Sequence, residues 1–275
     1  MIRMLKLELK NCLGRMEFKF VFAILMSFSI GSFLIACQKN YGHGMSFIRS
    51  AYDMSMMQGT STHVVWSIES MLIPLFASII YSDSYYSDHR SGVYKNILTR
   101  TDTKTYVWAK AIVIIVVTFT VFFIPLLLNQ LLSLLTFPTQ GFDNNFGFPP
   151  YDIGIQNYNS GFMFDLLRIQ SPLLYNLLYI FLISLVASLF AMFAYGAYFV
   201  SNKGKFATIV GVFLLYIVTE LAVSTLGYRL SLNNLLQPVN SGSFGVLMLW
   251  IAALFVLSIG MIAAKGFTPD GEIEK

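Results

Sequence analysis

The sequence predicts an all-α, polytopic membrane protein, and three observations lead to this fold class. Of its 275 residues, 56% are hydrophobic and only 12% are charged, whereas a soluble domain carries about a quarter charged residues. The apolar residues occur in blocks of roughly 20, which is the helix length that crosses a hydrocarbon core. The blocks are continuous and do not alternate with polar residues, which favours helices over a membrane barrel. We therefore expect a single transmembrane domain over residues 1–275.

Six apolar blocks define the expected transmembrane helices. They lie at residues 18–37, 63–81, 106–137, 173–200, 206–226 and 244–264. The third block is longer than a bilayer requires and contains Pro125, so we expect this helix to tilt or to kink. Pro74 predicts a similar kink in the second helix.

Residues 1–17 predict an amphipathic helix that precedes the first span. At about 100° per residue one face collects a stripe of apolar side chains, namely Ile2, Leu5, Leu9, Leu13, Met16 and Phe20. Arg3, Lys10 and Arg15 lie off this stripe. The pattern is typical of an interfacial helix whose basic residues face lipid head groups. An ordinary cytosolic extension of the first span is the alternative.

The distribution of basic residues predicts the orientation in the cell membrane. Of the 18 Lys and Arg residues, only Lys39, Arg49, Arg168 and Arg229 fall in connections that would lie outside if the N-terminus is inside. Positive charge concentrates on the cytoplasmic side of membrane proteins. We therefore expect a multi-pass protein with both termini in the cytoplasm. The same bias places the net charge of +4 against an anionic leaflet, so we expect no nucleic-acid partner.

The connection between the fifth and sixth helices, residues 227–243, is too polar to continue a span. Its leucines, Leu230, Leu232, Leu235 and Leu236, keep it close to the membrane. We expect a short re-entrant or interfacial segment before the last span.

No catalytic, metal or cofactor motif is recognisable in the sequence. There is no glycine-rich phosphate loop and no pair of closely spaced cysteines. Cys12 and Cys37 would be separated by roughly 40 Å on a continuous helix, far beyond disulfide reach. We expect no catalytic residue, no metal site and no cofactor in this chain.

The connection between the second and third helices, residues 82–105, carries the most functional information. Val93, Tyr94, Ile97 and Leu98 follow helical spacing, with Lys95 among them and Arg90 just before. A short amphipathic helix of this kind is typical of a docking element for a cytoplasmic partner. A solvated or membrane-resting loop is the alternative.

The amphipathic N-terminal helix, the six spans and this loop together resemble the permease subunits of type-2 ABC exporters. In the loop the resemblance covers about Asp88 to Lys110, with a Lys-Asn-Ile-Leu helix, then Thr-Arg, then two lysines six residues apart leading into the third span. The segment before the sixth span is also similar to that family.

The resemblance implies that the loop is a coupling helix, which contacts a separate ATPase subunit. The implied contact residues are Asp88, Arg90, Gly92, Tyr94, Lys95, Ile97, Leu98 and Arg100. ATP and Mg would bind to that ATPase partner. A second permease, identical or a sister chain, would complete the translocation path. The implied substrates are an antimicrobial peptide, a drug or a lipid, and resistance to antimicrobial peptides is a family expectation.

Polar groups within the expected spans are candidates for the translocation path. Glu69 and Glu220 are carboxylates at membrane depth, which cost several kcal/mol unless paired, protonated or hydrated. Asn129 is a further candidate. Interhelical hydrogen bonding is the alternative for Glu220 and Asn129, and contact with head groups is the alternative for Glu69.

Three other function classes remain open at this point. A secondary transporter would more often show internal repeats and broken helices. An intramembrane enzyme would need a nucleophile and base, or metal ligands, at matching depth. A sensory or assembly subunit is the third alternative.

Overall fold

The structure is a computed structural model, and it describes residues 1–44, 48–99, 101–139, 158–200 and 204–266. Six long helices dominate these ranges. They are α2 (Met16–Asn40), α3 (His63–Ile80), α6 (Thr103–Thr136), α9 (Pro172–Val200), α10 (Lys205–Leu226) and α12 (Phe244–Gly266). Each is long and apolar enough to cross a membrane. The predicted all-α, six-span fold class is confirmed.

The helix ends lie close to the boundaries expected from the apolar blocks. Every long helix begins and ends within three residues of the corresponding expected span. α3 and α6 contain Pro74 and Pro125, and each helix continues through its proline. Arg100 lies outside the described residues.

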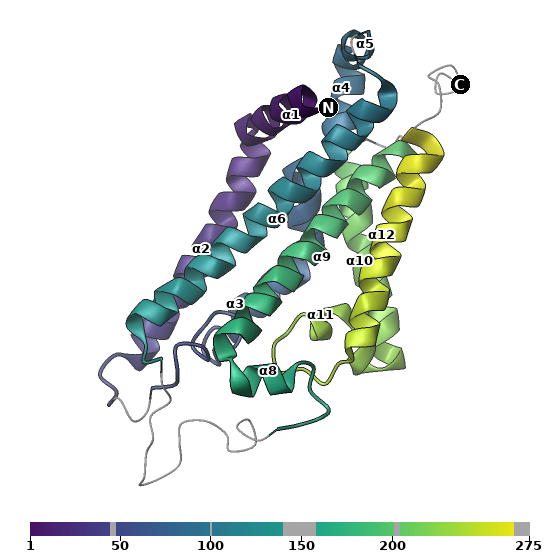
Figure 1. Cartoon of the computed structure of the whole chain (residues 1–275). Helices are drawn as coiled ribbons and strands as arrows, with labels where there is room; N and C mark the ends of the chain where they lie inside the picture. The colour runs from purple at the N-terminus through teal and green to yellow at the C-terminus, as the bar shows by residue number, and fades with distance from the viewer. Residues whose placement is uncertain (45–47, 100, 140–157, 201–203, 267–275) are drawn as a thin grey trace.

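The short helices are divided between the two ends of the bundle. α1 (Ile2–Gly14), α4 (Ser84–Arg90) and α5 (Val93–Leu98) lie at one end, together with the N-terminus and the end of α12 (Figure 1). α8 (Asp165–Gln170) lies at the other end. The 3₁₀ helix η2 (Tyr228–Leu230) and α11 (Leu232–Leu235) connect α10 to α12 near that second end.

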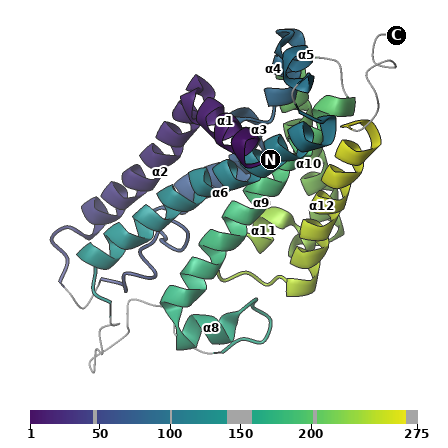
Figure 2. The same cartoon turned by 45° about the horizontal axis from the view of Figure 1, so that its top comes forward.

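α1 meets α2 at a break in the helix. Arg15 has extended backbone (φ −70°, ψ 143°), so α1 turns away from the direction of α2 (Figure 2). Most of the apolar stripe is exposed, with Ile2 and Met16 more than 70% exposed, whereas Glu8 and Cys12 are buried. An exposed apolar stripe beside a transmembrane bundle suits contact with lipid.

α9 is the central helix of the bundle. It packs against α3, α6 and α12. In α9, 78% of the apolar stretch that could span the membrane is buried within the protein, compared with 28% in α2 and 22% in both α10 and α12. Small residues such as Ala187, Ser188 and Ala191 lie fully inside the bundle. Without a hydrophobic driving force between helices in lipid, such small residues permit the close packing that holds helices together.

α9 and α12 approach each other closely at Gly196. A Cβ atom at this position would lie 3.1 Å from the Cε atom and 3.2 Å from the Cβ atom of Met261, and 3.3 Å from the carbonyl oxygen of Ser258. A larger side chain at residue 196 therefore has to push α12 away from α9.

Gly196→Leu should destabilise the helix bundle, because overpacking a close contact costs roughly 1–3 kcal/mol. The measurement is the melting temperature of the purified protein in detergent. Gly211→Leu is the matched control, since a Cβ at Gly211 meets no atom within 4 Å. Equal melting temperatures for the two variants would contradict close packing at Gly196.

Candidate functional site: the α4–α5 segment and the ion pairs beneath it

The predicted docking loop forms two short helices joined by a tight turn. α4 ends at Arg90 and α5 begins at Val93. Gly92 lies between them with φ +75°, a left-handed conformation that glycine adopts without steric cost. The turn directs α5 away from the bundle (Figure 1). The expected short helix in this loop is therefore present.

The expected ATPase-contact residues divide into exposed and enclosed groups. Arg90, Gly92 and Lys95 are exposed, and Ile97 and Leu98 are partly buried. Val93 adds an apolar side chain that is 44% exposed. The outward surface of this segment therefore combines positive charge with apolar atoms.

Tyr94 does not lie on that outward surface, because its side chain is only 4% exposed. Its ring makes edge contacts with Tyr85 and Tyr106, each with centroids 5.5 Å apart, and lies 5.6 Å from the His89 ring. Tyr85 in turn packs on Phe199 of α9. Aromatic pairs of this kind stabilise by roughly 0.5–1.5 kcal/mol each beyond burial. Tyr94 thus fixes α5 to the bundle instead of offering its ring to a partner.

Asp88 also points inward. Its Oδ2 atom lies 2.8 Å from the Nζ atom of Lys110 and accepts a 2.7 Å hydrogen bond from the hydroxyl of Tyr106. Both partners belong to α6. Asp88 therefore ties α4 to α6, and its carboxylate is engaged within the chain.

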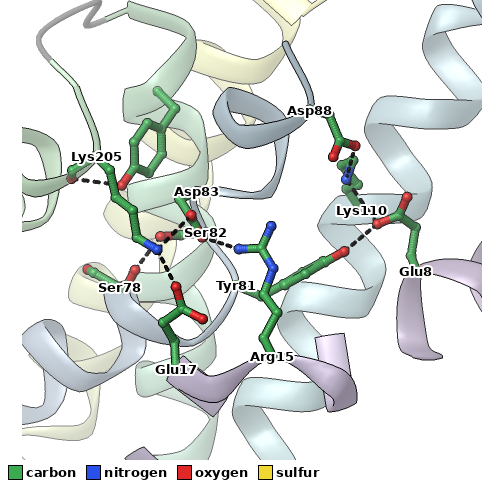
Figure 3. Close-up of polar contacts among 11 residues, drawn as sticks. Glu8, Arg15, Glu17, Ser78, Tyr81, Ser82, Asp83, Asp88, Lys110 and Lys205 are labelled. Atoms are coloured by element: carbon green, nitrogen blue, oxygen red, sulfur yellow. Dashed lines mark hydrogen bonds and ion pairs between the residues drawn. The ribbon is translucent and has the colours of Figure 1, made fainter. Parts of the chain in front are cut away.

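Lys110 joins α1 to the same site. Its ammonium donates to Glu8 Oε2 at 2.9 Å, and the hydroxyl of Tyr81 donates to the same oxygen at 2.6 Å (Figure 3). The side chains of Glu8 and Lys110 are each only 1% exposed. A buried ion pair therefore fixes α1 against α6.

Asp83, the residue before α4, binds cations from two further elements. Arg15 Nη1 lies 2.6 Å from its Oδ1, and Lys205 Nζ lies 2.9 Å from its Oδ2 (Figure 3). Lys205 also lies 2.6 Å from Glu17 Oε1 of α2. Arg15, which we expected to face lipid head groups, thus pairs within the protein.

We call these residues the ion-pair network: Glu8, Arg15, Glu17, Asp83, Asp88, Lys110 and Lys205. The network consists of two groups of ion pairs. Lys110 joins Glu8 of α1 and Asp88 of α4 to α6, and Asp83, just before α4, joins Arg15, Lys205 of α10 and, through Lys205, Glu17 of α2. Sequence reasoning placed only Asp88 in the site. Two signals in the sequence could have indicated others: Lys110 is a charge within an apolar span, and Glu8 and Cys12 are spaced to lie on one face of α1.

The candidate residues of the translocation path lie apart from this network. Asn129 accepts a hydrogen bond from the backbone N–H of Met56 at 2.7 Å and donates to the carbonyl of Ser29 at 2.8 Å. It therefore joins α6, α2 and the segment before α3. The neighbouring residue, Gln130, accepts a hydrogen bond at its Oε1 atom from the side-chain Nδ2 of Asn176 in α9, at 2.8 Å.

Glu220 binds the segment that follows α10. Its carboxylate accepts hydrogen bonds from the backbone N–H groups of Leu232 and Asn233, at 3.2 and 3.1 Å, and from the hydroxyl of Ser231. Glu220 therefore holds α11 in place. Glu69 is 2% exposed, and its Oε2 atom has no hydrogen-bond partner within the described part of the chain.

Metal binding finds no support in the described ranges. Those residues contain no group of three or more His, Cys, Asp or Glu side chains placed to hold a metal ion.

Lys110→Met should destabilise the protein by about 3–5 kcal/mol, because it leaves the buried carboxylate of Glu8 and the partly buried carboxylate of Asp88 without their cation. Adding Glu8→Gln should restore part of the loss. Melting temperature in detergent measures both effects. Lys6→Met, which changes an exposed lysine of α1, is the matched control and should melt like the unaltered protein. A Lys110→Met variant as stable as that control would show that the network is dispensable.

Comparison with known proteins places this region within a protein family. A search of curated proteins finds no match to the chain. A family model described as "Protein of unknown function (DUF2705)" matches residues 20–158, just over half of the chain. The match contains most of α2 and all of α3, α4, α5 and α6, and therefore includes Asp83, Asp88 and Lys110. The chain thus belongs to the DUF2705 family.

Proposed function

We propose that this protein is the membrane-spanning permease subunit of an ATP-driven exporter. In this proposal α5 docks on a separate ABC ATPase subunit, which supplies ATP hydrolysis, and a second permease completes the translocation path. The exported compound is an antimicrobial peptide, a drug or a lipid. The protein itself catalyses no reaction.

One observation carries the proposal: α5 is exposed on its outer surface and rigidly held on its inner surface. Arg90, Val93 and Lys95 are available to a partner. Tyr94 packs against α4 and α6, and Asp88 pairs with Lys110 of α6. A displacement of α5 by a partner would therefore move α4 and α6 as well.

The ion-pair network extends this connection to the outer helices of the bundle. Asp83 at the start of α4 binds Arg15 and Lys205, and Lys205 binds Glu17 of α2. Packed cores and ion pairs transmit displacement because they do not deform continuously. The network thus supports the proposal that a displacement of α4 and α5 is transmitted to α2, α6 and α10.

The proposal requires α5 to face the cytoplasm, as the distribution of Lys and Arg predicts. α1, α4 and α5 share one end of the bundle, and α8 lies at the other (Figure 1). The two ends therefore have to be accessible from opposite sides of the membrane.

Single-cysteine labelling should show from which side of the membrane each end of the bundle is accessible. The background carries Cys12→Ala and Cys37→Ala, which remove the two native cysteines. In the unaltered protein, burial raises the pKa of the Cys12 thiol to about 12, so Cys12 is expected to react poorly even before it is replaced. Lys95→Cys should react with a membrane-impermeant maleimide only in inside-out vesicles, and Ser160→Cys only in intact cells. The reverse pattern would exclude cytoplasmic docking of α5.

Charge reversal on α5 should remove the ATPase partner. The tagged protein is purified in mild detergent from its native cells, and ATP hydrolysis of the eluate is measured. Lys95→Glu and Val93→Asp should lose this activity, because each places a negative charge where the proposal has a positive or an apolar contact with the partner, and a mismatched charge at an interface opposes binding. Lys10→Glu on α1, also an exposed lysine, should retain it. The protein produced in a foreign host without its partner should hydrolyse no ATP.

Two outcomes of this experiment would overturn the proposal. Hydrolysis by the isolated protein would contradict a separate ATPase, and full activity of the eluate with both α5 variants would contradict docking at α5. Tyr94→Ala distinguishes a residue that holds α5 in position from a residue that contacts the partner directly. It should lower both the retained activity and the melting temperature, whereas Lys95→Glu should leave the melting temperature unchanged.

A further inference from the structure

The circumference of α1 divides into three sectors. At about 100° per residue, the buried side chains of Glu8 and Cys12 lie on the side that meets the bundle. Beside them lies an exposed apolar sector, formed by Ile2, Leu9 and Leu13. Beyond it lies an exposed cationic sector, formed by Arg3, Lys6 and Lys10. Only the exposed Leu7 falls outside this order. A helix with apolar and cationic sectors side by side suits the plane of a membrane surface.

The ion-pair network removes negative charge from the exposed surface of α1. Glu8 is the only acidic residue of α1, and its side chain is enclosed against Lys110 of α6 at 2.9 Å. None of the ion pairs within the described ranges involves a residue of the cationic sector. The charge that α1 presents outward is therefore entirely positive.

α1 lies at the level where a spanning helix begins. It ends at Gly14, and α2 begins at Met16. Spanning helices end near the head-group layer, and α1 turns away from the direction of α2 at this point (Figure 2). Met16 and Phe20 of α2 are exposed as well, so apolar surface continues from α1 onto the span. Acyl chains and lipid phosphates are both within reach of α1.

We propose that α1 binds anionic membrane lipids, with its apolar sector among the acyl chains and its cationic sector at the lipid phosphates. Basic residues close to a membrane surface are attracted to anionic lipids, and guanidinium and ammonium groups donate charge-assisted hydrogen bonds to phosphate. The contact involves neither α5 nor an ATPase. It therefore goes beyond the proposed function without resting on it, and its test uses the full chain alone.

A fluorophore on the apolar sector tests contact with acyl chains. The full chain carries Cys12→Ala, Cys37→Ala and Leu9→Cys, is labelled with bimane at residue 9, and is reconstituted in phosphatidylcholine vesicles. Phosphatidylcholine with brominated acyl chains should quench this bimane. Asn11→Cys is the matched control, because Asn11 is exposed on the opposite side of α1 from the apolar sector. Bimane at residue 11 should be quenched much less.

The same reporter measures selection for an anionic head group. Brominated phosphatidylglycerol and brominated phosphatidylcholine are compared at equal fractions of the total lipid, and quenching gives their relative affinity for α1. Phosphatidylglycerol should bind about tenfold more strongly or better, because each basic residue near an anionic surface contributes about fivefold. High salt should reduce this preference, since it screens exposed charges.

Charge removal identifies the residues responsible. Arg3→Gln together with Lys10→Gln should lower the preference for phosphatidylglycerol about fivefold or more. Lys39→Gln together with Arg229→Gln is the matched control, because it removes one exposed lysine and one exposed arginine at the opposite end of the bundle. This control should keep the preference of the reporter protein. Leu13→Cys, on the same sector, replaces Leu9→Cys if that variant does not fold.

Three outcomes would overturn the proposal. Absence of quenching at residue 9, or equal quenching at residues 9 and 11, would show that the apolar sector does not lie among acyl chains, as when a protein partner covers it. Equal affinity for the two lipids would exclude selection for an anionic head group. An unchanged preference after Arg3→Gln and Lys10→Gln would show that the cationic sector does not bind the phosphates.

Discussion

The ammonium of Lys110 lies about two turns into α6, where its side chain is 1% exposed. An unpaired charge at such a position costs several kcal/mol, so carboxylates have to reach it. Glu8 arrives from α1 and Asp88 from α4. This one requirement fixes α1 across the end of α6 and holds α4 against α6. The position of α5 depends on it, because α5 follows α4 after the turn at Gly92.

The two ends of the bundle are held together by different chemistry. Ion pairs and tyrosine hydroxyls dominate the end that carries α5. At the other end neutral amides predominate: Asn129 binds Met56 and Ser29, and Asn176 donates to the carbonyl of Tyr52 at 3.0 Å. Amide contacts join spans at low desolvation cost. The ion pairs at the α5 end give stronger coupling between elements but leave a larger penalty when one partner is lost.

The sequence was sufficient for the features that depend on local pattern. Continuous apolar blocks placed the six long helices, because a backbone in lipid has to form its hydrogen bonds within the segment. The stripe from Ile2 to Phe20 indicated α1, and the spacing of Val93, Ile97 and Leu98 indicated α5. The polar character of residues 227–243 indicated a break between the last two spans, where the structure has η2 and α11. Each of these signals lies within one element and needs no knowledge of its neighbours.

Only the tertiary structure decided which polar residues meet. Tyr94 appeared to be an outward anchor from its spacing, but helical periodicity does not state which face of α5 meets the bundle, and the ring lies among Tyr85, His89 and Tyr106. Glu8 and Lys110 are about a hundred residues apart in sequence and 2.9 Å apart in space. A cavity of about 530 Å³ is lined by described residues from four separate regions of the chain, namely residues 49–66, Thr139, residues 168–172 and residues 237–239. Such contacts depend on how helices pack, and a helix's own sequence determines its apolar and polar faces but not the side chain that each face will meet.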